Sequence, residues 1–158
     1  LYSAEKILLP KRDGGTLVRV TKRHQDIALS FLRGFLDDCF PDIKNPDKVL
    51  RRDMEDLLNK KALFLWKNKE GEFVSSAAQV RSSWNTASIS RVYTPPKYRG
   101  CGYAGRATAM LSQKIILEQN RSCNLFADVS NQISNYVYQK IGYTKIAATK
   151  TVRLCPSP

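Results

Sequence analysis

The spacing of apolar residues along the chain changes repeatedly between the period of about 3.6 residues typical of helices and the two-residue period of strands. Helical spacing predicts amphipathic helices over residues 21–40, 47–61, 103–119 and 131–141. Short apolar or alternating runs between turn residues predict strands over residues 16–20, 62–68, 72–81, 86–93, 123–129 and 143–154. This order of elements predicts a mixed α/β (α+β) domain.

The predicted strand 86–93 changes its phase partway along. Ala87 and Ile89 would face one side of the sheet, whereas Val92 falls on the opposite side. A β-bulge produces such a slip of one residue, because two residues of one strand then oppose one residue of its neighbour. The alternative is a regular strand in which Arg91 points inward at the edge of the sheet.

The predicted helix 131–141 carries two chemically different faces. Ile133, Val137 and Ile141 recur at helical spacing and predict a face that packs on the core. The other face is polar and consists of Asn131, Asn135 and Tyr138. A tyrosine and two amides on one face are candidates for binding or proton transfer.

Composition and charge narrow the class of protein. The 158 residues carry a formal charge of +12, and residues 62–158 alone hold 13 Lys+Arg against 4 Asp+Glu. This charge favours an anionic ligand such as a phosphate, a nucleic acid or an acidic surface. No apolar run approaches the roughly 20 residues of a membrane helix, and no signal-peptide core is present, so we expect a cytoplasmic protein without a membrane partner.

The cysteines and the first residues set expectations about metals and chain organisation. Four widely spaced cysteines and a single histidine, His24, do not give the ligand spacing of a zinc site, so we expect free thiols and no metal. The sequence begins without Met, which favours a fragment of a longer protein. Residues 1–15 are expected to form a linker or strand, and residues 16–158 a single domain.

Residues 98–105, YRGCGYAG, match two phosphate-binding patterns. One is the G-x-G-x-x-G of dinucleotide-binding folds, but such a fold needs several more strand–helix units than the rest of the chain can supply. The other is R-x-x-G-x-A, the pattern of a loop that holds coenzyme A, carried here by Arg99, Gly102 and Ala104. That pattern requires only a helix N-terminus whose free N–H groups meet a pyrophosphate, so we favour it.

Two segments of the sequence resemble a known family. Residues 92–113, VYTPPKYRGCGYAGRATAMLSQ, resemble the acetyl-CoA-binding segment of the GNAT superfamily of N-acetyltransferases, and residues 126–143, FADVSNQISNYVYQKIGY, resemble the segment that follows it. The resemblance implies the GNAT acyl-CoA N-acyltransferase fold, with a mixed, mostly antiparallel sheet flanked by helices. It also implies transfer of an acetyl group from acetyl-CoA to a primary amine by direct attack in a ternary complex.

The resemblance assigns roles to individual residues. The expected cofactor-binding residues are Val92, Tyr93, Arg99, Gly100, Cys101, Gly102, Tyr103, Ala104, Gly105, Asn131 and Asn135. The N–H of Val92 would bind the thioester carbonyl, and Tyr138 would donate a proton to the leaving thiolate. Considered without the resemblance, the residues favour Tyr138 as a half-buried packing aromatic and the asparagines as helix caps.

The general base is harder to identify. Many GNAT proteins place a glutamate on the strand before the loop, but residues 86–93 contain no acid. Asp128 is the expected catalytic partner and could accept a proton directly, accept it through water, or orient the amine. Its alternative role is a charge at the N-terminus of the following helix. Tyr93 is a weaker candidate, and His24 is expected to be solvated.

The acceptor amine is expected to lie over the first two helices. Phe31, Phe35, Asp37 and Asp38 could form an acidic pocket with aromatic walls, or the phenylalanines could be core and the acids solvated.

A non-enzymatic acyl-CoA sensor is the alternative function. A nucleic-acid-binding domain ranks last, because aromatic and basic residues are not interleaved. A homodimer, or attachment to a further N-terminal domain, is compatible with these observations.

Overall fold

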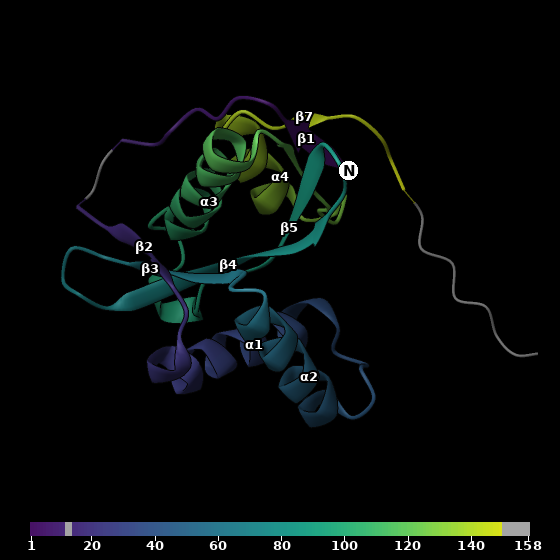
Figure 1. Ribbon diagram of the computed structural model, residues 1–158. Coiled ribbons are helices and arrows are strands. Elements are labelled where there is room, and N and C mark those ends of the chain that lie inside the picture. Colours follow the sequence, from purple (N-terminus) through teal and green to yellow (C-terminus); the bar gives the residue numbers. More distant parts are fainter. Residues whose placement is uncertain (12–13, 150–158) are drawn as a thin grey trace, which may run out of the picture.

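The computed structural model describes residues 1–11 and 14–149 (Figure 1). Within these residues seven strands form one sheet in the order β2-β3-β4-β5-β6-β1-β7. The strands are β1 Tyr2–Ala4, β2 Thr16–Arg19, β3 Leu63–Lys67, β4 Phe73–Ser82, β5 Thr86–Tyr93, β6 Ser122–Leu125 and β7 Thr144–Lys145. Neighbouring strands are antiparallel except for β5 and β6, which are parallel. The predicted mixed, mostly antiparallel sheet is therefore confirmed.

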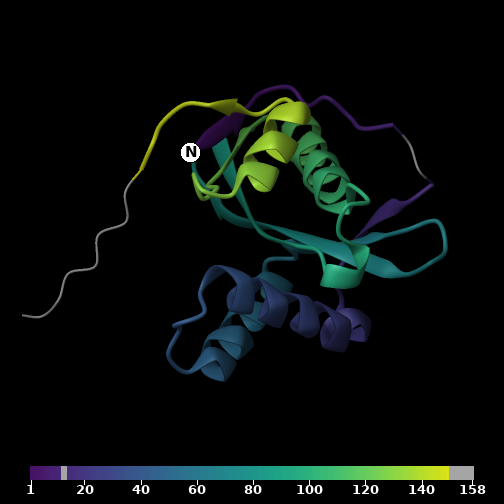
Figure 2. The same cartoon turned by 180° about the vertical axis from the view of Figure 1, so that it is seen from behind.

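Helices cover both faces of this sheet. They are α1 Gln25–Cys39, α2 Pro46–Asn59, α3 Tyr103–Gln119 and α4 Gln132–Lys140, with short 3₁₀ turns at η1 Lys22–His24 and η2 Pro96–Tyr98. Helices α1 and α2 lie on one side of the sheet, and α3 and α4 lie on the other (Figures 1 and 2). The result is a three-layer arrangement with a separate apolar core on each side of the sheet.

Strand β3 shows why part of the sequence reads as a continuous apolar run. Leu63 and Leu65 pack into the core beside α1 and α2, whereas Phe64 and Trp66 pack into the core beside α3. A strand that is covered on both faces needs apolar side chains at successive positions rather than at alternate ones.

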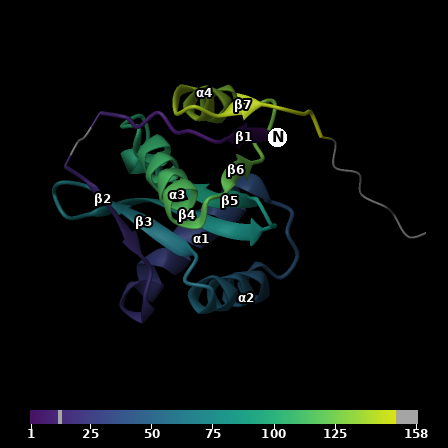
Figure 3. The ribbon, with the colours of Figure 1, turned by 45° about the horizontal axis from the view of Figure 1, so that its top comes forward.

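The first residues of the chain lie inside the sheet. Strand β1 pairs with β6 on one side and with β7 on the other (Figure 3). Tyr2 and Ala4 are buried in the core beside α3 and α4. The N-terminal ammonium of Leu1 donates a hydrogen bond to the carbonyl of Ala147 at 2.8 Å. Residues 2–4 are thus an interior strand of the same sheet as residues 16–145.

Three sequence predictions need correction. The strand predicted over 123–129 ends at Leu125, and residues 126–129 form a loop in which Phe126 and Val129 are exposed. Ile133 is 80% exposed, so it does not belong to the packing face of α4. Of the strand predicted over 143–154, only Thr144–Lys145 is a strand, and residues 150–154 lie outside the described residues. Apolar spacing misled in each case, because an apolar side chain near a chain reversal can face solvent.

Candidate functional site

Strands β5 and β6 separate from each other after a short parallel contact. Their pairing ends where Ile89 meets Leu125, yet β5 continues to Tyr93. Among the described residues no strand pairs with that side of β5 beyond Ile89. The gap leaves the last four residues of β5 with an open backbone edge, to which an extended ligand could hydrogen-bond.

A β-bulge lies on the open part of β5. Ala78 of β4 pairs with Ser90 and Ser76 pairs with Tyr93, so β5 has one more residue than β4 between these two pairs. Arg91 within this interval has a left-handed φ of 56°. The phase slip in the sequence is therefore a bulge, as predicted.

Two buried serines on β4 hold the carbonyl groups of the bulge. The hydroxyl of Ser76 donates to the carbonyl of Arg91 at 2.8 Å, and the hydroxyl of Ser75 donates to the carbonyl of Tyr93 at 3.0 Å. Both serines are almost completely buried, and burying a hydroxyl is costly unless it is hydrogen-bonded. These residues were missed at the sequence level, although two adjacent serines inside an apolar strand were the available signal.

The side chain of Arg91 ties the bulge to α2. Its guanidinium donates to both carboxylate oxygens of Asp53, at 2.7 and 2.9 Å. It also lies 5.4 Å from the centre of the Phe35 ring on α1. Both members of the ion pair are largely shielded from water, with 27% and 17% of their side chains exposed. The two hydrogen bonds of this ion pair hold Arg91, the bulge residue with the left-handed φ, in place.

The glycine loop leads directly into α3. Gly100 and Gly102 have left-handed φ angles of 80° and 77°, and Gly102 is the N-cap residue of the helix. The first intrahelical hydrogen bond runs from the N–H of Arg106 to the carbonyl of Gly102. The N–H groups of residues 103–105 therefore have no acceptor within the helix and carry the positive end of its dipole. This arrangement fits a pyrophosphate.

Gly105 has a packing role instead of completing a dinucleotide turn. A side chain at this position would meet the Val137 side chain of α4 at 3.2 Å. The mostly antiparallel sheet also differs from the parallel sheet of a dinucleotide-binding domain. The structure therefore supports the coenzyme A pattern in residues 98–105.

Two arginines of the loop region have protein partners. Arg99 donates to the carbonyl of Thr94 at 2.9 Å and pairs with Asp38 at 2.6 Å, and it lies 5.8 Å from the Tyr93 ring centre. Arg106 donates to the carbonyl of Cys101 at 2.6 Å. Arg99 thus connects the loop to the end of α1.

Tyr138 is buried beside the gap. Its ring packs between those of Tyr2 and Tyr143, with centroids 6.4 and 6.2 Å away. Burial, and then the charge of Cys39, raise the pKa of Tyr138 to about 12. Its hydroxyl therefore keeps its proton at neutral pH and can act as a proton donor.

The Cys39 thiol shows that several elements meet at this gap. Partial burial and the charge of Asp38 raise the pKa of Cys39, Arg91 lowers it, and Asp128 raises it again. Tyr138 also interacts electrostatically with Cys39. The end of α1, the bulge, the loop before α4 and Tyr138 therefore lie within electrostatic reach of one thiol.

The remaining polar residues predicted for the site organise the start of α4. Asn131 is the N-cap, and its side chain accepts from the N–H of Ser134 at 3.0 Å. Asn135 donates to the carbonyls of Asp128 and Asn131 and accepts from the Tyr2 hydroxyl at 2.7 Å. These contacts favour the capping alternative for both asparagines.

Asp128 is exposed and holds the same loop. Its carboxylate accepts hydrogen bonds from the hydroxyl and the N–H of Ser130, at 2.7 and 2.8 Å. These bonds lower its pKa, which makes the carboxylate a weaker proton acceptor but keeps it negatively charged.

The residues of α1 agree with the alternative to an acidic acceptor pocket, in which phenylalanine belongs to the core. Phe31 is buried core, and Asp38 pairs with Arg99. The Tyr93 ring packs so closely against α1 that a side chain at Gly34 would lie 2.2 Å from it. His24 caps its own turn by accepting from the N–H of Thr21 at 3.2 Å.

Residues 1–11 and 14–149 contain no group of three or more His, Cys, Asp or Glu side chains that could hold a metal ion. In the same part of the chain no helix combines the length and apolar character needed to cross a bilayer.

The FR47-like protein family matches residues 70–154, which is more than half of the chain. No curated protein sequence matches the chain significantly.

Solved structures share the fold at low sequence identity. A GNAT-family acetyltransferase from Colwellia psychrerythraea matches with a TM-score of 0.69 and 15% identity over 90% of this chain, which spans 50% of that protein. The aminoglycoside N-acetyltransferase AAC(6')-Iy in complex with CoA matches with a TM-score of 0.68 and 19% identity. The match covers 93% of this chain and 99% of that protein. Spermidine N-acetyltransferase from Vibrio cholerae, in complex with CoA and spermine, matches with a TM-score of 0.70 and 12% identity. The match covers 86% of this chain and 84% of that protein.

Proposed function

Because the chain belongs to the FR47-like protein family and has the fold of GNAT acetyltransferases, we propose that it is an acetyl-CoA-dependent N-acetyltransferase acting on a primary amine. One observation carries this proposal. The open, bulged edge of β5 leads, through the two left-handed glycines of the loop, to the N-terminus of α3. That continuous path suits a long ligand with a phosphorylated end and an extended end.

Residues 98–105 would bind the pyrophosphate of the cofactor. The N–H groups at the start of α3 would donate to its oxygens, and left-handed Gly100 and Gly102 keep the approach free of side chains. A side chain at Gly100 would meet no other atom within 4 Å, so the loop is open on that side. The extended arm would then hydrogen-bond to the open edge of β5 as an added strand.

The reacting end would lie beside the bulge and Tyr138. When bound, acetyl-CoA supplies the acetyl group as a thioester. The N–H of Val92 would donate to the carbonyl oxygen and stabilise the negative charge that develops there. The Tyr138 hydroxyl would give its proton to the departing sulfur.

Asp128 would act on the acceptor amine mainly through its charge. An alkyl amine is mostly an ammonium ion at neutral pH, so a carboxylate that stays ionised attracts it. The lowered pKa of Asp128 fits this orienting role better than proton abstraction. One ammonium proton would leave to water before the free amine attacks the carbonyl carbon. As the C–N bond forms and the C–S bond breaks, the nitrogen would lose a second proton to water, and the Tyr138 phenolate would regain a proton from water.

The proposed function includes a cytoplasmic location and an amine as the acceptor. The thiols of Cys39, Cys101 and Cys123 are free, which suits the reducing cytoplasm. Spermine and aminoglycosides, which carry primary amines, are the first acceptors to test. A homodimer or a further N-terminal domain is proposed as an additional partner.

An acetyl-transfer assay tests the proposed function. Acetyl-CoA is expected to raise the melting temperature and, with at least one amine of a panel containing spermine and an aminoglycoside, to release free coenzyme A. At a ligand concentration of about 100 Kd the stabilisation should be roughly 2.7 kcal/mol. Binding without transfer to any amine would favour an acyl-CoA sensor, and the absence of binding would exclude both functions.

The Asp53–Arg91 pair is expected to position the N–H of Val92. Replacing Asp53 by asparagine leaves a largely shielded guanidinium without its counter-charge, so the free energy of unfolding should fall by about 2 kcal/mol. The rate of acetyl transfer should fall about tenfold, because the bulge would lose its fixed position. Chemical unfolding and steady-state kinetics measure the two effects.

Asp56→Asn is the matched control. Asp56 lies on the same helix and pairs with Lys60, but both side chains are at least half exposed. Its removal should cost less than about 0.5 kcal/mol and leave the rate unchanged. Equal losses in the two variants would contradict a positioning role for Asp53.

A further inference from the structure

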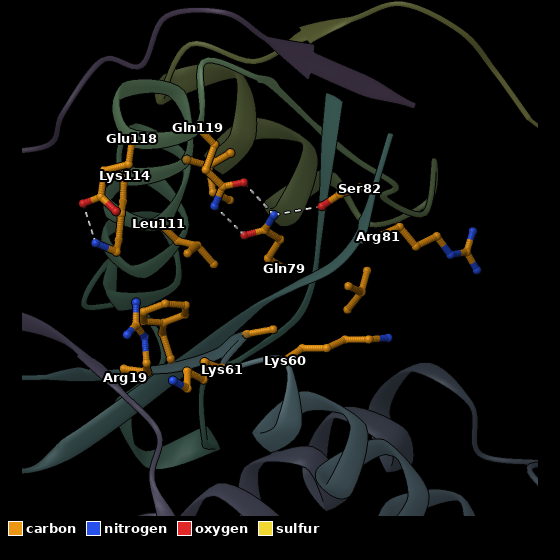
Figure 4. A pocket seen from close by; sticks show the side chains of 14 residues that line it. Arg19, Lys60, Lys61, Gln79, Arg81, Ser82, Leu111, Lys114, Glu118 and Gln119 are labelled. Atoms are coloured by element: carbon orange, nitrogen blue, oxygen red, sulfur yellow. Dashed lines mark hydrogen bonds and ion pairs between the residues drawn. The ribbon is translucent and has the colours of Figure 1, made fainter. Parts of the chain in front are cut away.

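A basic hollow of about 860 Å³ lies at the far end of α3 from the glycine loop. It is bounded by the second half of α3, the last residues of β4 and the turn that leads into β3 (Figure 4). It shares no residue with the loop 98–105 or with the open edge of β5 at residues 90–93. The hollow is therefore separate from the proposed acetyl-transfer site.

The floor of the hollow is apolar, and hydrogen bonds between β4 and α3 close one of its sides. Its apolar lining residues are Phe64 of β3, Val80 of β4, and Leu111 and Ile115 of α3. The side-chain amides of Gln79 and Gln119 join in two hydrogen bonds, of 3.0 and 3.1 Å, which connect β4 to α3 (Figure 4). This shape suits the uncharged body of a small molecule, and the volume falls in the range of about 300–1,000 Å³ typical of ligand sites.

The rim carries five cations and a single acid. The cations are Arg19, Lys60, Lys61, Arg81 and Lys114. Lys114 pairs with the acid, Glu118, and Lys60 pairs with Asp56. The other three cations are Arg19 of β2, Lys61 in the turn before β3 and Arg81 of β4. None of them has an ion pair among the described residues.

We propose that this hollow binds a small organic anion that has an apolar or aromatic body and at least two phosphate groups. A concave site lined by charge of one sign concentrates the field and raises the local concentration of the opposite ion. Arg19 and Arg81, which lie on opposite sides of the hollow (Figure 4), offer planar donor groups that match phosphate oxygens, and Lys61 adds a third charge next to Arg19. The ligand body would lie over the apolar lining of the hollow, beside the Arg19 guanidinium, which lies 5.6 Å from the centre of the Phe64 ring.

Calorimetric titration of the protein without coenzyme A tests this site. Coenzyme A is left out because it also carries an aromatic base and phosphates and would compete for the hollow, and the Gly102→Val variant, which changes the glycine loop alone, shows whether the measured binding depends on that loop. ATP is the probe that has both an aromatic body and phosphates, inorganic triphosphate has the charge alone, and citrate carries carboxylates. ATP is expected to bind most tightly. No binding of ATP, or tighter binding of citrate, would overturn the proposal.

Two double variants test whether ATP binds in the hollow. The double variant Arg19→Gln/Arg81→Gln should weaken ATP binding by at least about tenfold, since each exposed charge contributes up to roughly fivefold. The control double variant Arg23→Gln/Arg51→Gln removes the same charge from exposed positions outside the hollow and should change the affinity less than twofold, within about the error of such measurements.

Two further results would contradict the proposal. Equal weakening in both double variants would assign ATP binding to overall charge instead of to the hollow. A single-stranded oligonucleotide that binds the same residues more tightly than ATP would assign the hollow to nucleic acid. Because binding is measured directly, either result is independent of whether acetyl transfer is observed.

Discussion

Replacing Tyr138 by phenylalanine is expected to lower kcat for acetyl transfer by about a hundredfold, while the Kd for coenzyme A changes little. The hydroxyl has no hydrogen-bond partner among the described residues, and its pKa of about 12 keeps it protonated. Removing it therefore deletes a proton donor without disturbing the packing between Tyr2 and Tyr143. Steady-state kinetics together with calorimetric titration of coenzyme A separate the two effects.

Tyr136→Phe is the control for this change. Tyr136 lies on the same helix but is 63% exposed, so its hydroxyl should be dispensable. The pH dependence gives a second readout. The raised pKa means that wild-type kcat should show no fall from loss of this proton between about pH 8 and 10, where an ordinary tyrosine begins to ionise. Equal kcat in Tyr138→Phe and wild type would exclude Tyr138 as the acid.

Replacing Gly102 by valine is expected to raise the Kd for coenzyme A by about tenfold to a hundredfold, since forcing a β-branched residue into a left-handed conformation costs roughly 1–3 kcal/mol. Gly102 has a φ of 77°, and an added Cβ would lie 2.8 Å from Nη1 of Arg106. The loop would have to shift, and the N–H groups at the start of α3 would no longer point at the phosphates. Calorimetric titration measures the change.

Gly71→Val separates this effect from general backbone strain. Gly71 also has a left-handed φ, of 88°, but it lies in the turn between β3 and β4, where an added Cβ would make only an ordinary contact, 3.6 Å from Cε of Lys67. This variant should lose stability and retain the wild-type Kd for coenzyme A. If Gly102→Val binds coenzyme A as tightly as wild type, the loop 98–105 is not the pyrophosphate site.

Local features of the site could be predicted from the sequence because their causes are local. The phase slip between Ile89 and Val92 marks a bulge, since side-chain alternation is a property of one strand. The glycines before α3 mark a helix N-terminus with free N–H groups, since both backbone geometry and helix spacing extend over only a few residues. The resemblance to GNAT proteins rests on the same short segments.

Partners that are distant in sequence could not be predicted in the same way. Asp53 and Arg91 are 38 residues apart, and the pairing depends on how α2 packs against the sheet. Asp128 and Asn135 looked available for chemistry, but their turn and cap contacts engage them. A polar residue type indicates what a side chain can bind, whereas the tertiary structure decides what it does bind.

The sequence by itself determined the order of the elements from β2 onward, favoured the bulge and indicated a glycine-rich helix N-terminus before α3, because each follows from periodicity or glycine geometry within one segment. Only the tertiary structure placed β1 between β6 and β7 and left an open edge on β5. It also brought Arg19, Lys61 and Arg81 around one hollow. These features depend on pairing and packing between segments far apart in the chain, and no local pattern of residues encodes such contacts.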